Sequence, residues 1–255
     1  MGKAQPSPMD YEANDTTESD SPTGVVMSDA DRAIAARTWL VIPLFNEATV
    51  VGHVIRHARH TFPHVVCVDD GSTDDSAEAA RRAGAHVVHH PINLGQGASL
   101  QTGLRYALTD PRSEYFVTFD SDGQHRVEDA LDMVRRLAAE PLDIVVGSRF
   151  LDNRTKPGVI KRLVLKAAVL FQNVTSGVRL TDAHNGLRAL SRRAASSIRV
   201  TQNRMAHASE IVNEIGRLKL RYAEQPVHII YTDYSRSKGQ SVWNSVNIIS
   251  DLIFK

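Results

Sequence analysis

Acidic and amide side chains follow three separate apolar runs, where they could bind a metal ion and a phosphorylated ligand. The three groups are Pro43-Leu-Phe-Asn-Glu47, Asp69-Asp-Gly-Ser-Thr-Asp74 and Asp120-Ser-Asp-Gly-Gln-His125. In the last group, two carboxylates and one amide supply the hard oxygen ligands that Mg²⁺ and Mn²⁺ accept. An ion there would stabilise a diphosphate leaving group, on which negative charge builds as the bond to it breaks. Taken singly, such acidic residues could equally be helix caps or turn formers.

Parallel strands would bring these three groups together. Short β-rich runs alternate with helical segments up to Arg149, a pattern typical of a parallel sheet covered by helices. The predicted strands cover residues 39–43, 65–68, 86–89, 115–119 and 143–146. The predicted helices cover residues 48–60, 74–83, 96–108 and 128–139. Ligands of such α/β sheets bind at the carboxyl ends of the strands, which is where the polar groups fall.

The rest of the chain is less regular. A basic and apolar helix is predicted over residues 160–175 and a strand over residues 227–231, and this part should determine substrate choice. With 255 residues, 42% of them hydrophobic, the chain can bury one sizeable core, so we expect one catalytic domain over residues 36–240. Residues 1–35 are rich in Ser, Thr, Pro, Asp and Glu and are predicted to form a disordered tail.

The overall composition excludes several classes of protein. The formal net charge is +1, too small to indicate a nucleic-acid-binding protein. The single cysteine, Cys67, precludes a disulfide framework and suits a reducing cytoplasm. The sequence has neither a run of roughly 20 apolar residues nor a signal-peptide pattern, so we expect a protein that is soluble or peripheral to a membrane.

Five motifs, in this order along the chain, resemble those of family 2 glycosyltransferases. They are Val41-Ile-Pro-Leu-Phe-Asn-Glu47, Val68-Asp-Asp-Gly-Ser-Thr-Asp74, Asn93-Leu-Gly-Gln-Gly97, Asp120-Ser-Asp-Gly-Gln-His125 and Val146-Gly-Ser-Arg149. The resemblance runs from Trp39 to Gln240 and is greatest to the dolichyl or polyprenyl phosphate glycosyltransferases. It implies a Rossmann-like fold of the GT-A type and a metal-dependent reaction that uses a nucleotide sugar.

The resemblance also implies roles for individual residues. The implied nucleotide-sugar ligands are Pro43, Asn46, Glu47, Asp70, Gly97, Asp120, Ser121, Arg236 and Lys238. The implied metal ligands are Asp120, Asp122 and Gln124, with Mg²⁺ or Mn²⁺ as the cofactor. Asp122 is also expected to be catalytic, and His125 and Glu210 are expected to lie near the sugar.

Some of these residues have structural interpretations as well. Gly97 belongs to a Gly95-Gln-Gly97 turn that could either begin a helix or let the nucleotide approach the backbone closely. Glu210 could cap or pair within the core. Arg236 and Lys238 lie in a segment that resembles the loop the family closes on the diphosphate, although a basic connection without that role would have the same composition.

An acceptor phosphate would need cations to hold it but no strong general base, because it is already ionised. Arg149, Arg162 and Lys166 are the candidates, and Arg149 is also expected to be catalytic. The family carries a serine where this chain has Lys166, which leaves the phosphate contacts open. Each of these cations could instead belong to the solvated face of a packed helix.

The segment Asp182-Ala-His-Asn-Gly-Leu-Arg188 resembles the family's Asp-x-x-Ser-Gly-Phe-Arg motif, with Asn185 and Leu187 as the departures. Asp182 is predicted to be catalytic, either by orienting the acceptor or sugar or, for a saccharide hydroxyl acceptor, as the general base. The departures favour a sugar other than mannose. An N-acetylhexosamine or glucose from a UDP donor is slightly preferred over a GDP sugar.

Residues 241–255 are predicted to form an amphipathic helix too short to span a bilayer. It could lie on a membrane surface, dock a small membrane protein or pack against the catalytic domain. Together these features predict inverting transfer of a hexose or N-acetylhexosamine from a nucleotide diphosphate sugar to a polyprenyl phosphate, for cell-envelope glycan synthesis at the cytoplasmic face of the plasma membrane. Transfer to a saccharide hydroxyl, a nucleotide-sugar-binding regulatory subunit and a nucleotidyltransferase stay open as alternatives.

Overall fold

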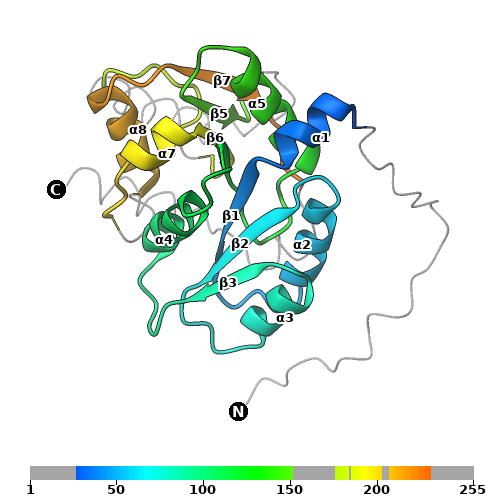
Figure 1. The fold of residues 1–255 in the computed structure, drawn as a ribbon. Helices are drawn as coiled ribbons and strands as arrows, with labels where there is room; N and C mark the ends of the chain where they lie inside the picture. Colours follow the sequence, from blue (N-terminus) through cyan, green and yellow to red (C-terminus); the bar gives the residue numbers. More distant parts are fainter. Residues whose placement is uncertain (1–26, 152–175, 184, 203–206, 231–255) are drawn as a thin grey trace.

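The computed structural model describes residues 27–151, 176–183, 185–202 and 207–230, which form a seven-stranded sheet covered by helices (Figure 1). The strands are β1 (Thr38–Leu44), β2 (His64–Asp69), β3 (His86–His89), β4 (Tyr115–Thr118), β5 (Ile144–Ser148), β6 (Arg188–Ser191) and β7 (Tyr222–Pro226). Their order across the sheet is β3-β2-β1-β4-β6-β5-β7, and only the pairs made by β6 are antiparallel. The predicted α/β architecture with a mostly parallel central sheet is therefore confirmed.

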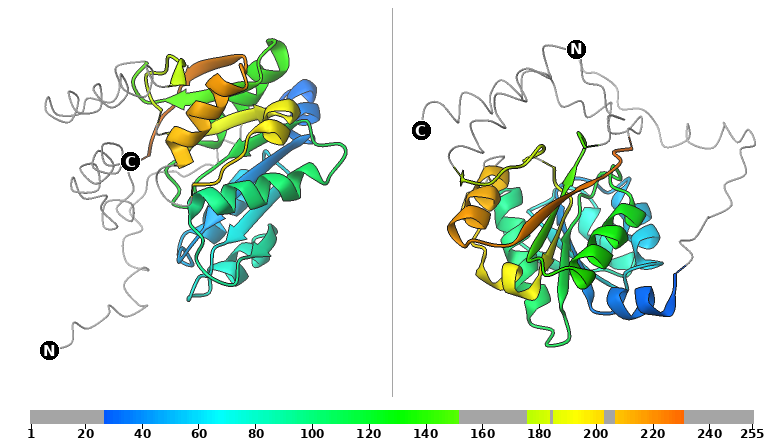
Figure 2. Two further views of the ribbon diagram at one scale, coloured as in Figure 1. Left: turned by 90° about the vertical axis from the view of Figure 1, so that its left-hand side faces the viewer. Right: turned by 90° about the horizontal axis from the view of Figure 1, so that it is seen from above.

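Helices cover both faces of this sheet. The described helices are α1 (Asp29–Ala35), α2 (Val51–Arg59), α3 (Ser76–Arg82), α4 (Gln96–Leu108), α5 (Val127–Ala139), α7 (Arg192–Ser197) and α8 (His207–Arg217). Helices α4, α7 and α8 pack on one face, and α1, α2, α3 and α5 pack on the other (Figure 2). Among the described helices, none is long and apolar enough to cross a bilayer.

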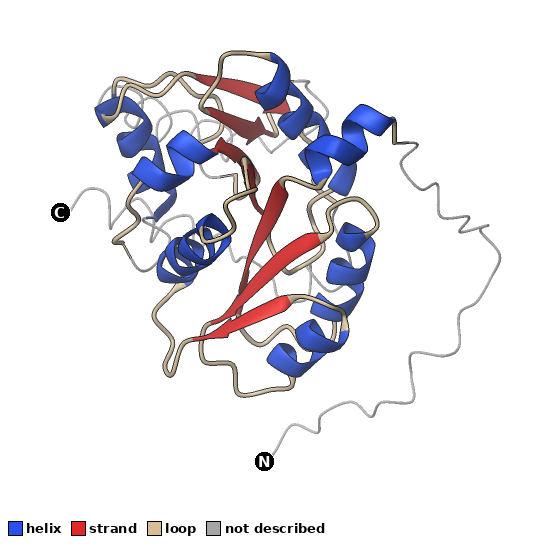
Figure 3. Cartoon of the chain, viewed as in Figure 1, coloured by secondary structure: helices blue, strands red, loops and turns tan. Residues whose placement is uncertain are grey.

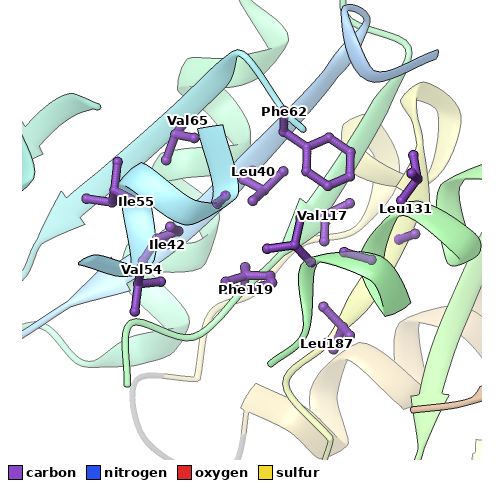
Figure 4. Packing of buried hydrophobic residues seen from close by; sticks show 14 of the residues in the cluster. Leu40, Ile42, Val54, Ile55, Phe62, Val65, Val117, Phe119, Leu131 and Leu187 are labelled. Carbon is purple, nitrogen blue, oxygen red and sulfur yellow. The ribbon is translucent and has the colours of Figure 1, made fainter. Parts of the chain in front are cut away.

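Buried apolar side chains form one cluster on each face of the sheet, and the alternation of side chains along β1 contributes to both. Leu40 and Ile42 join the cluster beneath α2 and α5, and Trp39 and Val41 join the cluster beneath α4 and α8. Figure 4 shows the first cluster, in which Phe62 also lies. Because both faces of the strand are buried, its sequence is an apolar run rather than a polar–apolar alternation.

The central position of β1 brings the three polar groups of the sequence to one edge. Leu44 of β1 lies opposite Asp69 of β2, and Val41 lies opposite Thr118 of β4. All three strands are parallel, so the loops that follow them leave the sheet on the same side (Figure 3).

The disordered tail predicted over residues 1–35 is too long at its C-terminal end, because residues 29–35 form helix α1. Ser28 and Asp31 form a capping box, and Asp31 also accepts a hydrogen bond from Arg135 Nε of α5 at 2.6 Å. The acidic residues that suggest disorder are thus first-turn residues that stabilise a helix N-terminus. Ala35 anchors the other end in the core.

The prediction of a strand over residues 227–231 is wrong, because the strand in this region is β7, at residues 222–226. It pairs with β5 from Ile144 opposite Tyr222 to Ser148 opposite Pro226 and lies at the sheet edge, half-buried. The sequence of β7, Tyr-Ala-Glu-Gln-Pro, contains no apolar run that would reveal it. Ile229 forms only an isolated bridge with His125. The helix predicted over residues 160–175 lies outside the described residues.

Candidate active site

The loops after β1 and β2 are hydrogen-bonded to each other at the carboxyl edge. The Asn46 side-chain oxygen accepts a hydrogen bond from the Thr73 N–H at 2.9 Å, and the Asn46 N–H donates to Ser72 Oγ at 3.0 Å. The Glu47 N–H donates to Ser76 Oγ at 2.7 Å. The two loops therefore form one continuous rim, which carries the predicted nucleotide ligands Asn46 and Glu47.

Asp70 holds the turn that precedes α4. Its buried carboxylate lies 2.7 Å from His90 Nδ1 and accepts hydrogen bonds from the N–H groups of Leu94 and Gly95 at 2.9 and 2.7 Å. Both carboxylate oxygens therefore have partners within the protein. The implied contact of Asp70 with the ribose or base stays a prediction, as does that of Pro43, which lies beside β2 in the sheet.

Gly95 and Gly97 are glycines for different reasons. Gly95 caps α4 with a φ of 93°, a conformation that favours glycine. At Gly97, a β-carbon would stand 2.0 Å from the carbonyl oxygen of Gln202 and 2.9 Å from Cβ of His207. The close contact at Gly97 is thus with the segment leading into α8, and its contact with a nucleotide stays a prediction.

Asp120 follows β4 and is held by its neighbours. His125 Nε2 lies 2.9 Å from Oδ2, and Gln96 Nε2 donates to Oδ1 at 3.2 Å. A β-carbon at Gly186 would stand 2.4 Å from Oδ2, so the carboxylate packs against the backbone of Gly186. Burial alone would raise the pKa of Asp120, but His125 and the charge of Arg188 hold it below its ordinary value.

The pKa of Asp122 is shifted in the opposite direction from that of Asp120. Burial and the repulsion from Asp120 raise the pKa of its carboxyl group above the ordinary value, and the charge of Glu47 adds to this effect. The Gln124 N–H, which donates to Asp122 Oδ1 at 3.0 Å, opposes it. Two carboxylates that repel each other at the carboxyl ends of the strands form a site that a bound cation would stabilise.

The donor set fits Mg²⁺ or Mn²⁺ bound together with a phosphorylated ligand. Asp120, Asp122 and the side-chain amide of Gln124 offer hard oxygen donors. Within the described residues, no three His, Cys, Asp or Glu side chains could hold a metal ion by themselves. Mg²⁺ commonly binds one or two carboxylates and completes its shell with waters and substrate phosphates, so a pair of carboxylates is sufficient.

The loop that carries this pair is braced by the segment after β7. The Ile230 N–H donates to the carbonyl oxygen of Gln124 at 2.9 Å, next to the bridge between His125 and Ile229. His125 is buried and positions Asp120, and Ser121 is buried as well. The implied contacts of His125 with the sugar and of Ser121 with the donor stay predictions.

Arg149 and Asp182 form a bidentate ion pair beside this site. Arg149 Nε donates to Asp182 Oδ2 at 2.7 Å and Nη2 donates to Oδ1 at 2.9 Å, while the Arg149 N–H also bonds Oδ2 at 3.1 Å. The side chain of Asp182 is 2% exposed and that of Arg149 is 28% exposed. Asp182 thus fixes a partly exposed cation at the end of β5, and both of its predicted catalytic roles stay predictions.

Glu210 is hydrogen-bonded to the segment that precedes α8. Its carboxylate accepts hydrogen bonds from the N–H groups of Thr201 and Gln202 and from Thr201 Oγ1, at 2.5 to 3.0 Å. This arrangement matches the capping interpretation of the sequence, and the sugar contact stays a prediction. The predicted phosphate and diphosphate ligands Arg162, Lys166, Arg236 and Lys238 lie outside the described residues.

Two residues of the site have no assigned role in the sequence motifs. Arg188 opens β6 and is fully buried, and Gly186 provides the space that Asp120 occupies. The signal for Arg188 was present in the sequence, since a charged residue in the apolar run Leu187-Arg-Ala-Leu190 must either be exposed or find charged partners.

Comparisons with known proteins agree with this geometry. The family model for glycosyl transferase family 2 matches residues 39–199. An uncharacterised protein of Methanocaldococcus jannaschii is 32% identical over 222 residues, which cover 85% of this chain and 91% of that protein.

Two named relatives are also similar. The UDP-N-acetylglucosamine–dolichyl-phosphate N-acetylglucosaminyltransferase of Methanococcus voltae is 27% identical, with 84% of this chain and 94% of that protein covered. The polyprenol monophosphomannose synthase of Mycolicibacterium smegmatis is 30% identical over 64% of each chain.

Among solved structures, glucosyl-3-phosphoglycerate synthase from Mycobacterium tuberculosis, in complex with Mn²⁺ and UDP-glucose, superposes with a TM-score of 0.65. Its sequence is 21% identical, and the match covers 88% of this chain and 80% of that one. The fold is therefore the GT-A type that the motifs imply.

Proposed function

Since this chain belongs to glycosyl transferase family 2, we propose that it moves a hexose or N-acetylhexosamine from a nucleotide diphosphate sugar to a polyprenyl phosphate. The reaction would invert the anomeric centre by in-line attack of a phosphate oxygen and give a polyprenyl-phosphate-linked sugar. The named relatives support the acceptor, because one is named for transfer to dolichyl phosphate and the other for synthesis of a polyprenol monophosphomannose.

The observation that carries this proposal is that an anionic and a cationic subsite lie at the same, carboxyl end of the parallel strands. Asp120 and Asp122 form an anionic pair, and Arg149 is a partly exposed cation fixed by Asp182. An anionic pair suits the donor side, where a divalent ion bound with the diphosphate would stabilise the charge of the leaving group. A fixed cation suits an anionic acceptor.

The state of Asp182 favours a phosphate acceptor over a saccharide hydroxyl. A general base must offer a free oxygen to the proton it removes. Both oxygens of Asp182 accept hydrogen bonds from Arg149, and the Asp182 N–H is itself bonded to Glu224 Oε1 at 3.1 Å. An ionised phosphate needs no such base, so Asp182 can serve by holding Arg149.

Exposed apolar side chains at the same edge support a lipid acceptor. The large hydrophobic residues that are most exposed in the described part of the chain are Phe45, Ile92, Leu94, Leu151 and Ile230. Each follows the carboxyl end of a strand, namely β1, β3, β5 or β7. We propose that this apolar rim, together with residues 241–255, holds the protein at the cytoplasmic surface of the membrane, where the polyprenyl chain would stay in the bilayer.

The donor is proposed to be a UDP sugar, with Mg²⁺ or Mn²⁺ as the cofactor. The name of the Methanococcus voltae relative, which includes UDP-N-acetylglucosamine, supports this choice over a GDP sugar. The departures at Asn185 and Leu187 from the motif of the mannosyl-transferring branch support it as well.

The test is a transfer assay on the full chain. Purified protein is incubated with Mg²⁺ or Mn²⁺, a panel of UDP and GDP sugars and a short polyprenyl phosphate, and lipid-linked sugar is followed by mass spectrometry. Metal-dependent product that is lost in Asp122→Ala and kept in Glu78→Gln, an exposed carboxylate on α3, is the expected result. Nucleotide release without a lipid product would reject the polyprenyl phosphate acceptor.

A further inference from the structure

Arg188 lies within the sheet, on the face covered by α4, α7 and α8. It is opposite Thr118 of β4 and Val146 of β5. Its neighbours Leu187 and Ala189 point into the cluster beneath α5, so Arg188 points to the other face by the alternation of a strand. Its side chain is among the largest fully buried ones in the described structure, with the residue 1% exposed.

The hydrogen bonds of Arg188 do not account for its burial. Nη2 donates to the carbonyl oxygen of Ala183 at 3.3 Å, but Nε and Nη1 have no hydrogen-bond partner among the described residues. Burial lowers the pKa of Arg188 to about 10, so the side chain stays positively charged at neutral pH. A buried cation with two unpaired donors is costly, and such a group requires an explanation.

Two carboxylates of the site provide the compensating charge. Asp120 follows Thr118, the β4 residue opposite Arg188, and its carboxylate packs on Gly186, two residues before Arg188. Asp182 lies next to Ala183, which accepts the Arg188 hydrogen bond. Both carboxylates favour the charged form of Arg188, although neither bonds it directly in the described structure.

Charges of opposite sign therefore alternate across the site, from Arg149 through Asp182 and Arg188 to Asp120. The two arginines balance two of the four carboxylates Asp120, Asp122, Asp182 and Glu47. A free divalent ion approaching Asp120 would thus meet less net negative charge than the carboxylates alone supply, with a fixed cation behind them. A diphosphate adds negative charge and oxygen ligands, and so would strengthen the binding of the divalent ion at this site.

We propose that Arg188 is a positioning residue whose positive charge stabilises the carboxylates of the site while no divalent ion is bound. Because this charge also repels a free divalent ion, tight binding of the ion depends on the nucleotide diphosphate. This inference rests on the proposed function for the assignment of the ion to Asp120 and Asp122. Arg188 acts on Asp120 and Asp182 through its charge, without touching substrate. Because the coupling between two ligands is reciprocal, the ion and the nucleotide each promote binding of the other.

The test is Mn²⁺ binding to the full chain, measured from the electron paramagnetic resonance signal of free Mn²⁺, with no acceptor present. Wild-type protein is expected to bind Mn²⁺ at least tenfold more tightly with UDP or GDP than without. Arg188→Met is expected to bind Mn²⁺ without nucleotide on the order of tenfold more tightly than wild type, since a nearby positive charge is gone. Arg188→Lys should behave as wild type does.

The control is Arg193→Met, which removes one positive charge from an exposed position on α7, beside Asp143 at the opposite edge of the sheet. It should leave Mn²⁺ affinity unchanged. A purely structural role of Arg188 would weaken metal binding in the neutral variant, so tightening separates the two roles.

Two results would overturn the proposal. One is a folded Arg188→Met or Arg188→Gln protein that binds Mn²⁺ no more tightly than wild type does, with folding checked by circular dichroism. The other is wild-type protein that binds Mn²⁺ equally well with and without nucleotide, which decides the matter even if no neutral variant folds. Failure of lipid transfer would contradict the proposed function and leave these binding results unaffected.

Discussion

Gly186 lies so close to Asp120 that a β-carbon on residue 186 would stand 2.4 Å from Asp120 Oδ2 and 3.0 Å from its Cγ. The contact joins the loop before β6 to the carboxylate after β4. Thr118 Oγ1, which donates to the carbonyl oxygen of Gly186 at 2.6 Å, fixes the same loop from the other strand. The position of the predicted metal ligand therefore depends on a residue without a side chain.

Gly186→Ala should consequently displace the Asp120 carboxylate from His125 and Gln96. We expect a loss of metal-dependent transfer on the order of a hundredfold, because small misplacements of a reacting group have costs of this size. Steady-state kinetics with varied Mn²⁺ is the measurement. Gly52→Ala is the control, since its new methyl group would meet only the flexible end of Arg56 at 3.3 Å and an ordinary contact at 3.8 Å. Transfer by Gly186→Ala within twofold of wild type would contradict this account of Asp120.

Asp182→Asn tests whether Asp182 holds Arg149 or removes a proton. Loss of one charge from the ion pair should raise the KM for polyprenyl phosphate and lower kcat/KM roughly tenfold, with the shape of the pH profile kept. Near-complete loss of activity at every pH would instead identify Asp182 as a general base and favour a saccharide hydroxyl acceptor.

The ion pair between Asp31 and Arg135 should make stability depend on acid pH. The hydrogen bond from Arg135 and those from Ser28 hold the pKa of Asp31 below its ordinary value of 3.8. A depressed folded-state pKa contributes stability at pH values above the unfolded-state pKa, and this contribution is lost as the pH falls further.

Asp31→Asn should therefore lower the Tm by a few degrees at pH 7 and by progressively less below about pH 4. Asp29→Asn is the matched control, because the side chain of Asp29 is 98% exposed and, within the described part of the chain, pairs only with Arg32 of the same helix. A Tm difference for Asp31→Asn that stays constant down to pH 3 would show that the ion pair does not anchor α1.

Ile92→Asp tests the apolar rim. Ile92 is 64% exposed, so its replacement should leave the fold and the binding of Mn²⁺ and UDP unchanged. Loss of an apolar contact and gain of a negative charge should reduce the fraction of protein that cosediments with anionic vesicles severalfold. Unchanged cosedimentation would place the membrane contact elsewhere, with residues 241–255 as the next candidate.

The strands that the sequence predicts contain an apolar run, whether both faces are buried, as in β1 and β2, or the strand lies partly exposed at the sheet edge, as β3 does. The β1 and β2 segments contain apolar runs, and α4 begins at Gln96, directly after Gly95, whose positive φ favours glycine. β7 could not be found in this way, since its sequence Tyr-Ala-Glu-Gln-Pro contains no apolar run, and β6 opens with a charged residue. Both strands are specified by their pairing with β5 rather than by their own composition.

The candidate site shows a similar division. The order of the motifs predicted that Asp120, Asp122 and the loop of Asn46 would meet at one edge, because parallel neighbouring strands must end together. The partners of each side chain were not predictable, since Asp70 and Glu210 turn to backbone N–H groups that only the folded chain brings near. The relation between Arg188 and Asp120 likewise depends on the antiparallel register of β6.

The most direct test of the central claim compares two acceptors that differ by one group, a short polyprenyl phosphate and the polyprenol of the same chain length, under one donor and one metal. Mass spectrometry of the lipid fraction identifies which of them carries the sugar. Transfer to the phosphate alone is predicted, because Arg149 offers a cation and both oxygens of Asp182, the candidate base, already accept hydrogen bonds from Arg149. Transfer to the polyprenol at a comparable rate would contradict the assignment of Arg149 to an acceptor phosphate and of Asp182 to its support.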